Sequence, residues 1–252
     1  MSKSFKKLYT NKKDFIAYKE QIYHKNKKSL LWFGGLNSDM SGTKAQYLSS
    51  FSKKNRINFC RFDYFGHGRS SKEFNNCVIS DWLNNGIKIM DQIIDNEVIL
   101  IGSSMGGWIS TLVSLKRRTK VKGLILIAPA LDMTENLMWK KFSSKEKNLI
   151  KTRGYIERYV EDYDSSYRIT KKLIDDGRKH LILEDIIDLN VPIRIFHGIK
   201  DEAVPWELSL DLMSSFSSDD INVSFNKNGN HSLSSDSDLK SLGDAILDVY
   251  NN

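Results

Sequence analysis

One serine in the chain has glycine two residues away on both sides. Ser104 stands in Gly102-Ser103-Ser104-Met105-Gly106, and this segment follows the apolar run at residues 98–101. A Gly-x-Ser-x-Gly pattern between a strand and a helix is typical of a sharp turn that exposes a serine hydroxyl for nucleophilic attack. The glycines leave room for neighbouring backbone at that turn. A plain glycine-rich turn could have the same sequence, but the strand before it and the helical pattern after it favour a nucleophile.

A serine hydroxyl needs a base to become a good nucleophile, and the chain offers five histidines. His231 lies in Asn228-Gly229-Asn230-His231-Ser232, a loop after the last expected strand. This loop leaves the carboxyl end of its strand, as Ser104 does, and open α/β sheets bind ligands at this end. His197 ends a strand, where packing is expected, and His67 lies in a Gly-His-Gly turn. His231 is therefore the predicted base.

The third member of such a triad is an acid that orients the base and stabilises its charged form. Asp201 follows the expected strand that ends at His197, so the chain order is serine, aspartate, histidine. Serine hydrolases with this kind of turn carry their triad in that order. Glu202 is adjacent and could take the same role. Its more ordinary explanation is an acid in the first turn of a helix, opposite the helix dipole.

Acyl transfer also needs backbone N–H groups that stabilise the oxyanion of the tetrahedral intermediate. One is expected from Met105, directly after the serine. The other is expected from the loop after the first strongly apolar strand, where Phe33-Gly34-Gly35-Leu36 stands and Leu36 is the predicted donor. A plain turn is the alternative explanation of these two glycines.

Strand-like and helix-like segments alternate around these residues. Short apolar runs bounded by glycine are typical of buried parallel strands, and segments with helical spacing separate them. The alternation predicts an α/β fold, with a mostly parallel sheet and helices on both faces. Strands are expected at 15–23, 30–33, 57–62, 98–101, 121–128, 191–197 and 221–225, and helices at 43–54, 79–94, 108–115, 204–216 and 233–250.

The alternation stops between residues 131 and 190, which are rich in charge and aromatics and hold helical patches without a convincing core strand. We therefore expect a core of residues 1–130 and 191–252, and a cap insertion at 131–190 that folds over the serine. Four apolar residues of the cap could line an acyl pocket or could instead anchor the cap to the core. They are Leu137, Met138, Trp139 and Phe142.

The composition narrows the class of protein. The length of 252 residues suits one large domain with a sizeable insertion. The net charge of +7 is spread along the chain without a basic stripe interleaved with aromatics, so no nucleic-acid partner is expected. Cys60 and Cys77 form neither a disulfide framework nor a metal-ligand spacing. The predicted site needs no metal and no organic cofactor.

The chain opens with a basic segment that carries Lys3, Lys6, Lys7, Lys12 and Lys13. It lacks the apolar stretch of a secretory signal, and Asp14 and the scarcity of arginine disfavour an import signal. A solvated tail is expected there. No apolar run approaches the roughly 18 residues of a membrane span. A cytoplasmic location with reduced thiols is expected.

Five segments together resemble the α/β-hydrolase superfamily, in the order of that family. They are the strand with Gly34-Gly35-Leu36, residues 61–70 (Arg-Phe-Asp-Tyr-Phe-Gly-His-Gly-Arg-Ser), the turn at Ser104, and the loops of Asp201 and His231. The resemblance covers nearly the whole chain outside the cap. Residues 36–45 and 102–108 are similar to the mitochondrial abhydrolase-10 group and its bacterial relatives, which includes acyl-glucuronide esterases and palmitoyl-protein thioesterases.

The resemblance implies cleavage of an ester or thioester with a substantial acyl part. Ser104, Asp201 and His231 fall on the family's triad positions, and Leu36 and Met105 on its oxyanion positions. Gly34 stands where many relatives have histidine, which removes one hydrogen-bond partner and leaves the backbone donor in place. The expected partner is a small-molecule ester or thioester.

Several alternatives remain open beside this expectation. A serine nucleophile disfavours dehalogenases and epoxide hydrolases, which use aspartate. Carbon–carbon hydrolysis, acyl transfer to another acceptor and peptide hydrolysis are compatible with the same residues. A catalytically inactive binding protein on this fold is the alternative from another class, and the presence of all three triad candidates argues against it.

Overall fold

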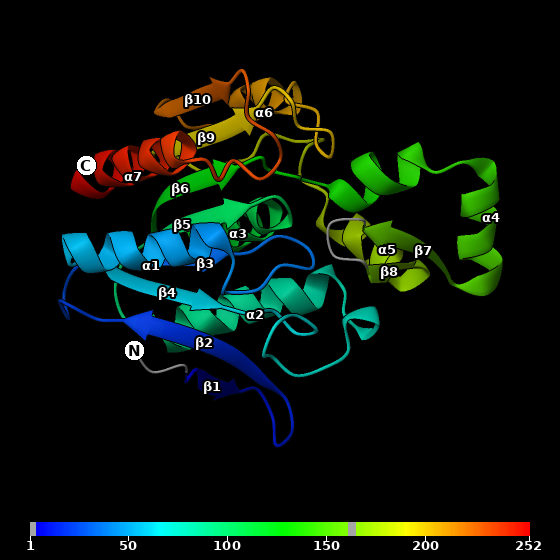
Figure 1. Cartoon of the computed structure of the whole chain (residues 1–252), viewed down its shortest axis with the longest axis horizontal. Coiled ribbons are helices and arrows are strands. Elements are labelled where there is room, and N and C mark those ends of the chain that lie inside the picture. Colours follow the sequence, from blue (N-terminus) through cyan, green and yellow to red (C-terminus); the bar gives the residue numbers. More distant parts are fainter. Residues whose placement is uncertain (1–3, 161–164) are drawn as a thin grey trace.

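The computed structural model of the chain describes residues 4–160 and 165–252, and an eight-stranded sheet runs through its centre (Figure 1). The strand order is β1-β2-β4-β3-β5-β6-β9-β10. Within the sheet β2 pairs antiparallel with β1 and β4, and the pairs from β4 through β10 are parallel. The expected α/β class with a mostly parallel sheet is confirmed. The strands are β1 (Lys6–Tyr9), β2 (Phe15–Gln21), β3 (Ser29–Phe33), β4 (Asn58–Phe62), β5 (Val98–Ser103), β6 (Val121–Ile127), β9 (Ile193–Gly198) and β10 (Ile221–Asn226).

The central strands are buried on both faces because side chains alternate between the two sides of a strand. In β3, Leu31 and Phe33 join one hydrophobic cluster while Leu30 and Trp32 join the other. All residues of β3 and β5 are buried. This explains why these segments appear in the sequence as continuous apolar runs.

Helices cover both faces of the sheet. One cluster holds side chains of α2 (Ile79–Gln92), α3 (Met105–Lys116) and α6 (Leu208–Ser215). The other holds side chains of α1 (Thr43–Asn55) and α7 (Asp236–Asn251). A capping box starts α7, in which the Ser235 hydroxyl accepts the Asp238 amide at 3.2 Å and the Asp238 carboxylate accepts the Ser235 amide at 3.1 Å.

Residues 131–190, hereafter the insertion, lie between β6 and β9 and beyond the carboxyl ends of the parallel strands (Figure 1). Their two strands form an antiparallel sheet of their own, apart from the central one. Ser143 and Glu146 form a capping box at α4. The elements are a short π-helix η2 (Thr134–Met138), 3-10 helices η3 (Trp139–Lys141) and η5 (Arg178–His180), α4 (Ser144–Arg153), β7 (Tyr155–Val160), β8 (Ser165–Thr170) and α5 (Lys171–Gly177).

Two buried carboxylates tie the insertion to itself and to the core. Asp132, at its start, accepts the amides of Ile182 and Leu183, near its end, at 3.0–3.1 Å. Asp176 accepts the Ser80 amide at 2.7 Å and the Ser80 hydroxyl at 2.9 Å, so α5 of the insertion caps the start of α2. The base of the insertion is therefore fixed by hydrogen bonds to ionisable groups.

Two sequence-based expectations about the chain are wrong. Lys6 and Lys7 are not in a solvated tail, because they lie in the edge strand β1, which pairs with β2 along its whole length although both lysines are exposed. Lys3 lies outside the described residues. The helix expected from residue 204 begins only at Leu208. Within the described part of the chain, the helices are too short or too polar to cross a membrane.

Candidate active site

Ser104 occupies a strained turn between β5 and α3. Its backbone angles are φ 55° and ψ −119°, a conformation that non-glycine residues rarely adopt. The Ser104 amide donates to the Ile127 carbonyl at 2.9 Å, and the Ser104 carbonyl accepts the amides of Gly107 at 2.9 Å and Ala130 at 3.1 Å. These bonds hold the strained residue in place from both sides. The hydroxyl group is thereby held at the carboxyl end of the sheet.

The glycines around Ser104 are there because backbone passes very close to them. A Cβ on Gly102 would lie 2.3 Å from the Gly106 carbonyl oxygen, and a Cβ on Gly106 would lie 2.2 Å from the Phe33 carbonyl oxygen. Both distances are far below van der Waals contact. The turn therefore requires glycine at both positions, for the reason that the sequence pattern suggested.

Asp201 and His231 come together from two loops at the same end of the sheet. The His231 Nδ1 lies 2.7 Å from the Asp201 Oδ2. The loops are joined by a backbone bond from the Lys200 amide to the Gly229 carbonyl at 2.9 Å. The Asp201 side chain is fully buried, whereas 35% of the His231 side chain is exposed. The carboxylate is in the position needed to fix the ring orientation of an accessible imidazole.

The carboxylate of Asp201 is strongly held in its ionised form. Burial alone would raise its pKa, but hydrogen bonds from His197, His231 and the Val204 amide outweigh burial and hold the pKa well below its ordinary value. Glu202 is exposed, and the contact with His231 is made by Asp201. The helical explanation of Glu202 is wrong, because the nearest helix begins six residues later, at Leu208.

The loop after β3 lies against the nucleophile turn. A Cβ on Gly35 would stand 3.5 Å from the Ser104 Cβ and 3.5 Å from the Ser103 carbonyl oxygen. Leu36 therefore comes directly after a residue whose backbone lies against Ser104. Met105 is the first residue of α3, where amides have no partner within the helix. Both predicted oxyanion donors lie beside the serine.

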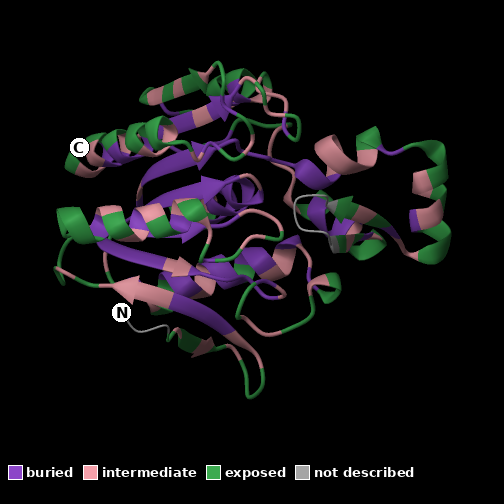
Figure 2. Ribbon diagram, viewed as in Figure 1, coloured by how far each residue is buried: buried purple, intermediate pink, exposed green. Residues whose placement is uncertain are grey.

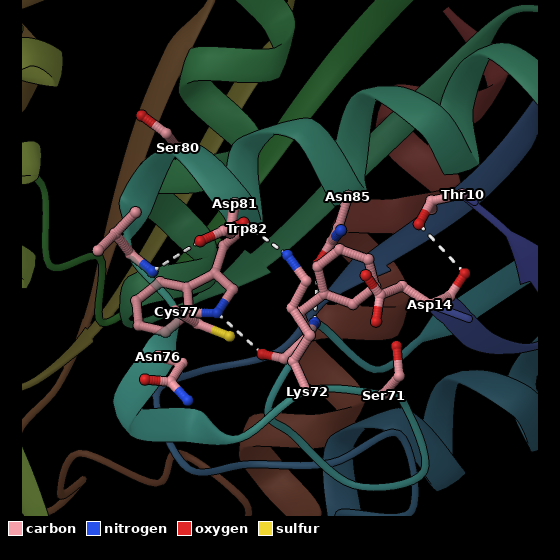
Figure 3. A network of polar contacts seen from close by, with 12 residues as sticks. Thr10, Asp14, Ser71, Lys72, Asn76, Cys77, Ser80, Asp81, Trp82 and Asn85 are labelled. Atoms are coloured by element: carbon pink, nitrogen blue, oxygen red, sulfur yellow. Dashed lines mark hydrogen bonds and ion pairs between the residues drawn. The ribbon is translucent and has the colours of Figure 1, made fainter. Parts of the chain in front are cut away.

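The turn-rich segment at residues 63–71 binds the loop after β3 through the side chain of Asp63. The Asp63 carboxylate accepts the Met40 amide at 2.6 Å and the Arg69 amide at 2.8 Å. Burial raises its pKa to about 6. The segment is fixed in turn to α2, where the Trp82 indole donates to the Phe65 carbonyl at 3.0 Å, beside the Lys72–Asp81 ion pair (Figure 3). The loop after β3 is thus held by a polar network outside the candidate site.

A cavity of about 1500 Å³ joins the candidate residues. Leu36, Ser104 and His231 line it, so the two outer triad candidates and one oxyanion candidate meet at one space. The first part of the insertion supplies mainly apolar side chains to the wall, its strands β7 and β8 add charged ones such as Glu157, Arg158 and Arg168, and the wall beside His231 is polar. Apolar lining residues include Phe74, Ala130, Met133, Leu137, Met138 and Phe142, and polar ones include Lys44, Lys200, Glu202, Asn230 and Ser232.

The chain matches the family model described as serine aminopeptidase, S33, over residues 24–238. The chain belongs to this α/β-hydrolase family. The palmitoyl-protein thioesterase ABHD10, mitochondrial, of mouse is 32% identical over 222 residues, 87% of this chain and 74% of the relative. The bovine protein of the same name is 30% identical over 223 residues, 87% of this chain and 72% of the relative. The expected resemblance to the abhydrolase-10 group is confirmed.

Solved structures agree with this relationship. The chain superposes on a putative hydrolase from Agrobacterium vitis S4 with a TM-score of 0.93 at 29% identity, and on mouse alpha/beta hydrolase domain-containing protein 10 with a TM-score of 0.89 at 29% identity. In each case 98% of both chains is covered. The similar curated proteins are named mitochondrial, and the expected cytoplasmic location of this chain stays a prediction.

Two further residues of this α/β hydrolase lie at the candidate triad, one bonded to a neighbour of His231 and one to Asp201, and sequence analysis missed both. The Lys44 ammonium donates to the Ser232 carbonyl, next to His231, and burial lowers its pKa to about 8. His197, expected only to pack, also contacts Asp201. The four-residue separation of His197 and Asp201 was the available signal. His67 stays apart among the rings of Tyr64, Phe74 and Trp82.

Proposed function

We propose that this hydrolase cleaves carboxylic esters or thioesters through an acyl-enzyme on Ser104. The observation that carries the proposal is the 2.7 Å contact between Asp201 and an accessible His231, at a cavity that Ser104 also lines. A strained serine, an imidazole with one nitrogen bound to a carboxylate, and two nearby amides make up the parts of a Ser-His-Asp mechanism.

In the first step the Ser104 hydroxyl oxygen attacks the carbonyl carbon while His231 Nε2 takes the hydroxyl proton. The buried Asp201 stabilises the imidazolium that forms, since its carboxylate accepts the Nδ1–H. The Leu36 and Met105 amides hold the oxyanion. His231 then gives the proton to the departing alcohol or thiol, and the acyl group remains on Ser104.

In the second step water replaces the leaving group. His231 takes a proton from the water, whose oxygen attacks the acyl carbon, and it then gives that proton to the departing Ser104 oxygen, which releases the carboxylic acid and regenerates the Ser104 hydroxyl. The low pKa of Asp201 supports this role, because an ionised carboxylate is needed throughout the cycle. No redox step occurs.

The apolar residues that the first part of the insertion supplies to the cavity support a substrate with a substantial acyl part. Leu137, Met138 and Phe142 line the cavity, as three of the four predicted acyl-pocket residues. Trp139 instead packs with Phe142 and under the Arg178 guanidinium inside the insertion. We propose that residues 131–190 act as a cap whose apolar side chains receive the acyl chain. The relatives named palmitoyl-protein thioesterase agree with such a substrate.

A fluorophosphonate probe tests the nucleophile. The wild-type protein should be labelled on Ser104, and Ser104→Ala should lose labelling and at least about 100,000-fold of its esterase activity. Ser103→Ala is the matched control, since the adjacent serine is buried and should leave both unchanged. Equal labelling of Ser104→Ala and wild type would overturn the nucleophile, and an unlabelled wild type would favour an inactive binding protein.

A substrate panel tests the reaction. p-Nitrophenyl esters and acyl-CoA thioesters of increasing chain length should be hydrolysed, with long chains preferred. Activity on short acyl groups alone would contradict the acyl pocket. Aminoacyl and peptide amides belong in the panel because the matched family is described as serine aminopeptidase, and turnover of amides without esters would replace the proposal with peptide hydrolysis.

A further inference from the structure

A second histidine, which does not line the cavity, contacts the proposed triad acid. His197 lies in β9, its side chain is fully buried, and both ring nitrogens have partners. Its Nε2 lies 3.1 Å from the Asp201 Oδ2 and 3.1 Å from the Val204 carbonyl oxygen, and its Nδ1 lies 2.6 Å from the Ser209 hydroxyl. A buried ring held at three points has one orientation.

These partners identify the nitrogen that carries the proton. A carboxylate oxygen and a carbonyl oxygen accept hydrogen bonds and cannot donate them, so the nitrogen that faces both must be the N–H. The Nε2–H of His197 therefore donates to Asp201 and Val204. The Ser209 hydroxyl, which can donate, supplies its hydrogen to Nδ1. A neutral imidazole satisfies every group at this position.

The carboxylate of Asp201 consequently accepts four hydrogen bonds. Its Oδ1 accepts the amides of Ala203 and Val204, each at 2.9 Å. Its Oδ2 accepts from His231 at 2.7 Å and from His197 at 3.1 Å. His231 must gain and lose a proton in the proposed mechanism, whereas His197 is sealed in the core. Of the two imidazoles that bind Oδ2, only that of His231 therefore changes its protonation state in the proposed mechanism.

We infer that His197 is a positioning residue of the active site, which fixes the Asp201 carboxylate through a permanent Nε2–H bond and weakens its hold on protonated His231. The inference rests on the proposed function. The second donor draws negative charge away from the oxygen that His231 shares. Without that donor, Asp201 stabilises the imidazolium more strongly and is held in its place beside His231 by one hydrogen bond fewer.

Two carboxamide variants separate this role from simple packing. In His197→Gln the amide nitrogen is as many bonds from Cα as Nε2 and can replace the donor to Asp201. In His197→Asn the amide nitrogen stands where Nδ1 did and cannot reach. We expect His197→Asn to lower kcat per labelled Ser104 about tenfold, the effect of one hydrogen bond to a charged group, and His197→Gln to retain most of it.

A pH titration gives the decisive measurement. In His197→Asn the acid limb of the kcat/KM profile, and the His231 imidazole titration followed by 15N NMR, should move up by about half to one pH unit. In His197→Gln both should stay near the wild-type position. Identical titrations in the two variants, or a wild-type His197 protonated on Nδ1, would overturn the inference. The NMR measurement needs no turnover, so it decides this point even where the protein proves to be no esterase.

Discussion

The core and the insertion hold their residues in different ways. In the core, whole strands such as β3 and β5 are buried, and Ser104, Asp201 and His231 stand in loops at the carboxyl ends of parallel strands. In the insertion many residues are exposed or half-buried (Figure 2). Its own hydrophobic cluster is small and consists of Phe142, Ile150, Ile156, Ile169 and Ile174.

This difference suits the core to hold catalytic groups in fixed positions and the insertion to shape the binding site for a particular substrate. A strained backbone such as that of Ser104 persists only where the surroundings fix it, and the packed core provides this. The insertion has fewer buried contacts and supplies side chains such as Leu137 and Met138 to the cavity wall. We therefore expect core substitutions to act on the rate of every substrate and insertion substitutions to act on the choice among substrates.

Among substitutions that leave the Ser104 nucleophile in place, the largest effect is expected in the core, from Asp201→Asn. One Asn oxygen cannot accept from both the two amides and the two imidazoles that the carboxylate binds. With its NH₂ toward His231, it forces the imidazole into the tautomer that cannot take the Ser104 proton. Hydrolysis of all esters should fall about 1,000-fold to 10,000-fold, measured as kcat/KM across chain lengths.

Glu202→Gln is the matched control for that substitution. Glu202 is exposed at the cavity, one residue from Asp201, and it should change kcat/KM less than about threefold. A large loss in Glu202→Gln with a small one in Asp201→Asn would exchange the roles of the two acids. If Asp201→Asn lost activity only on long-chain esters, the expectation that core substitutions affect every substrate would be wrong.

The core could be predicted because each part of it leaves a local signal. Continuous apolar runs mark the buried strands, and the glycines at 102 and 106 reflect backbone contacts of 2.2–2.3 Å. The order of the loops then places Asp201 and His231 at one edge, where the structure puts their contact. The role of each residue in a reaction remains a prediction.

The remaining features depend on contacts between distant segments, which periodicity does not encode. The strands β7 and β8 lack the apolar run of a core strand, because Glu157 and Arg158 interrupt β7 while Arg168 and two serines interrupt β8. The start of α6 moved to Leu208 because Asp201 binds the amides of Ala203 and Val204, which keeps that segment in a turn. Lys44 reaches Ser232 from 188 residues away.

A smaller effect is expected in the insertion, from Leu137→Ser. This half-buried leucine lines the cavity, and a hydroxyl in its place removes apolar contact worth about one or two methylene groups. The kcat/KM of long-chain esters should fall about tenfold, with acetyl esters unchanged. Leu210→Ser, at an exposed leucine of α6, should alter neither. Equal losses on short and long esters would show that the insertion contributes to the chemistry itself.

The smallest effect is expected on stability, at the joint between core and insertion, which is the contact of Asp176 with Ser80 at the start of α2. Burial would raise the pKa of Asp176, but bonds from Ser80 and Lys179 and the nearby His180 outweigh it and lower the pKa below its ordinary 3.8. A lowered pKa means that the ionised form stabilises the fold above pH 3.8 and that this stabilisation is lost as the pH falls through the folded-state pKa. Asp176→Asn keeps the shape and removes the charge, so it should lower the free energy of unfolding by about 1–2 kcal/mol at pH 7.

The difference between wild type and Asp176→Asn should shrink as the pH falls below 3.8, because wild-type Asp176 then becomes neutral as well. Thermal unfolding from pH 3 to pH 7 measures it, as a change of about 2–8 °C in Tm at pH 7. Asp175→Asn is the control, since 44% of that side chain is exposed and its ion pairs with Lys171 and Arg178 lie at the surface. A difference that is constant with pH would assign the loss to packing, and a loss of activity without loss of stability would make the joint part of the site.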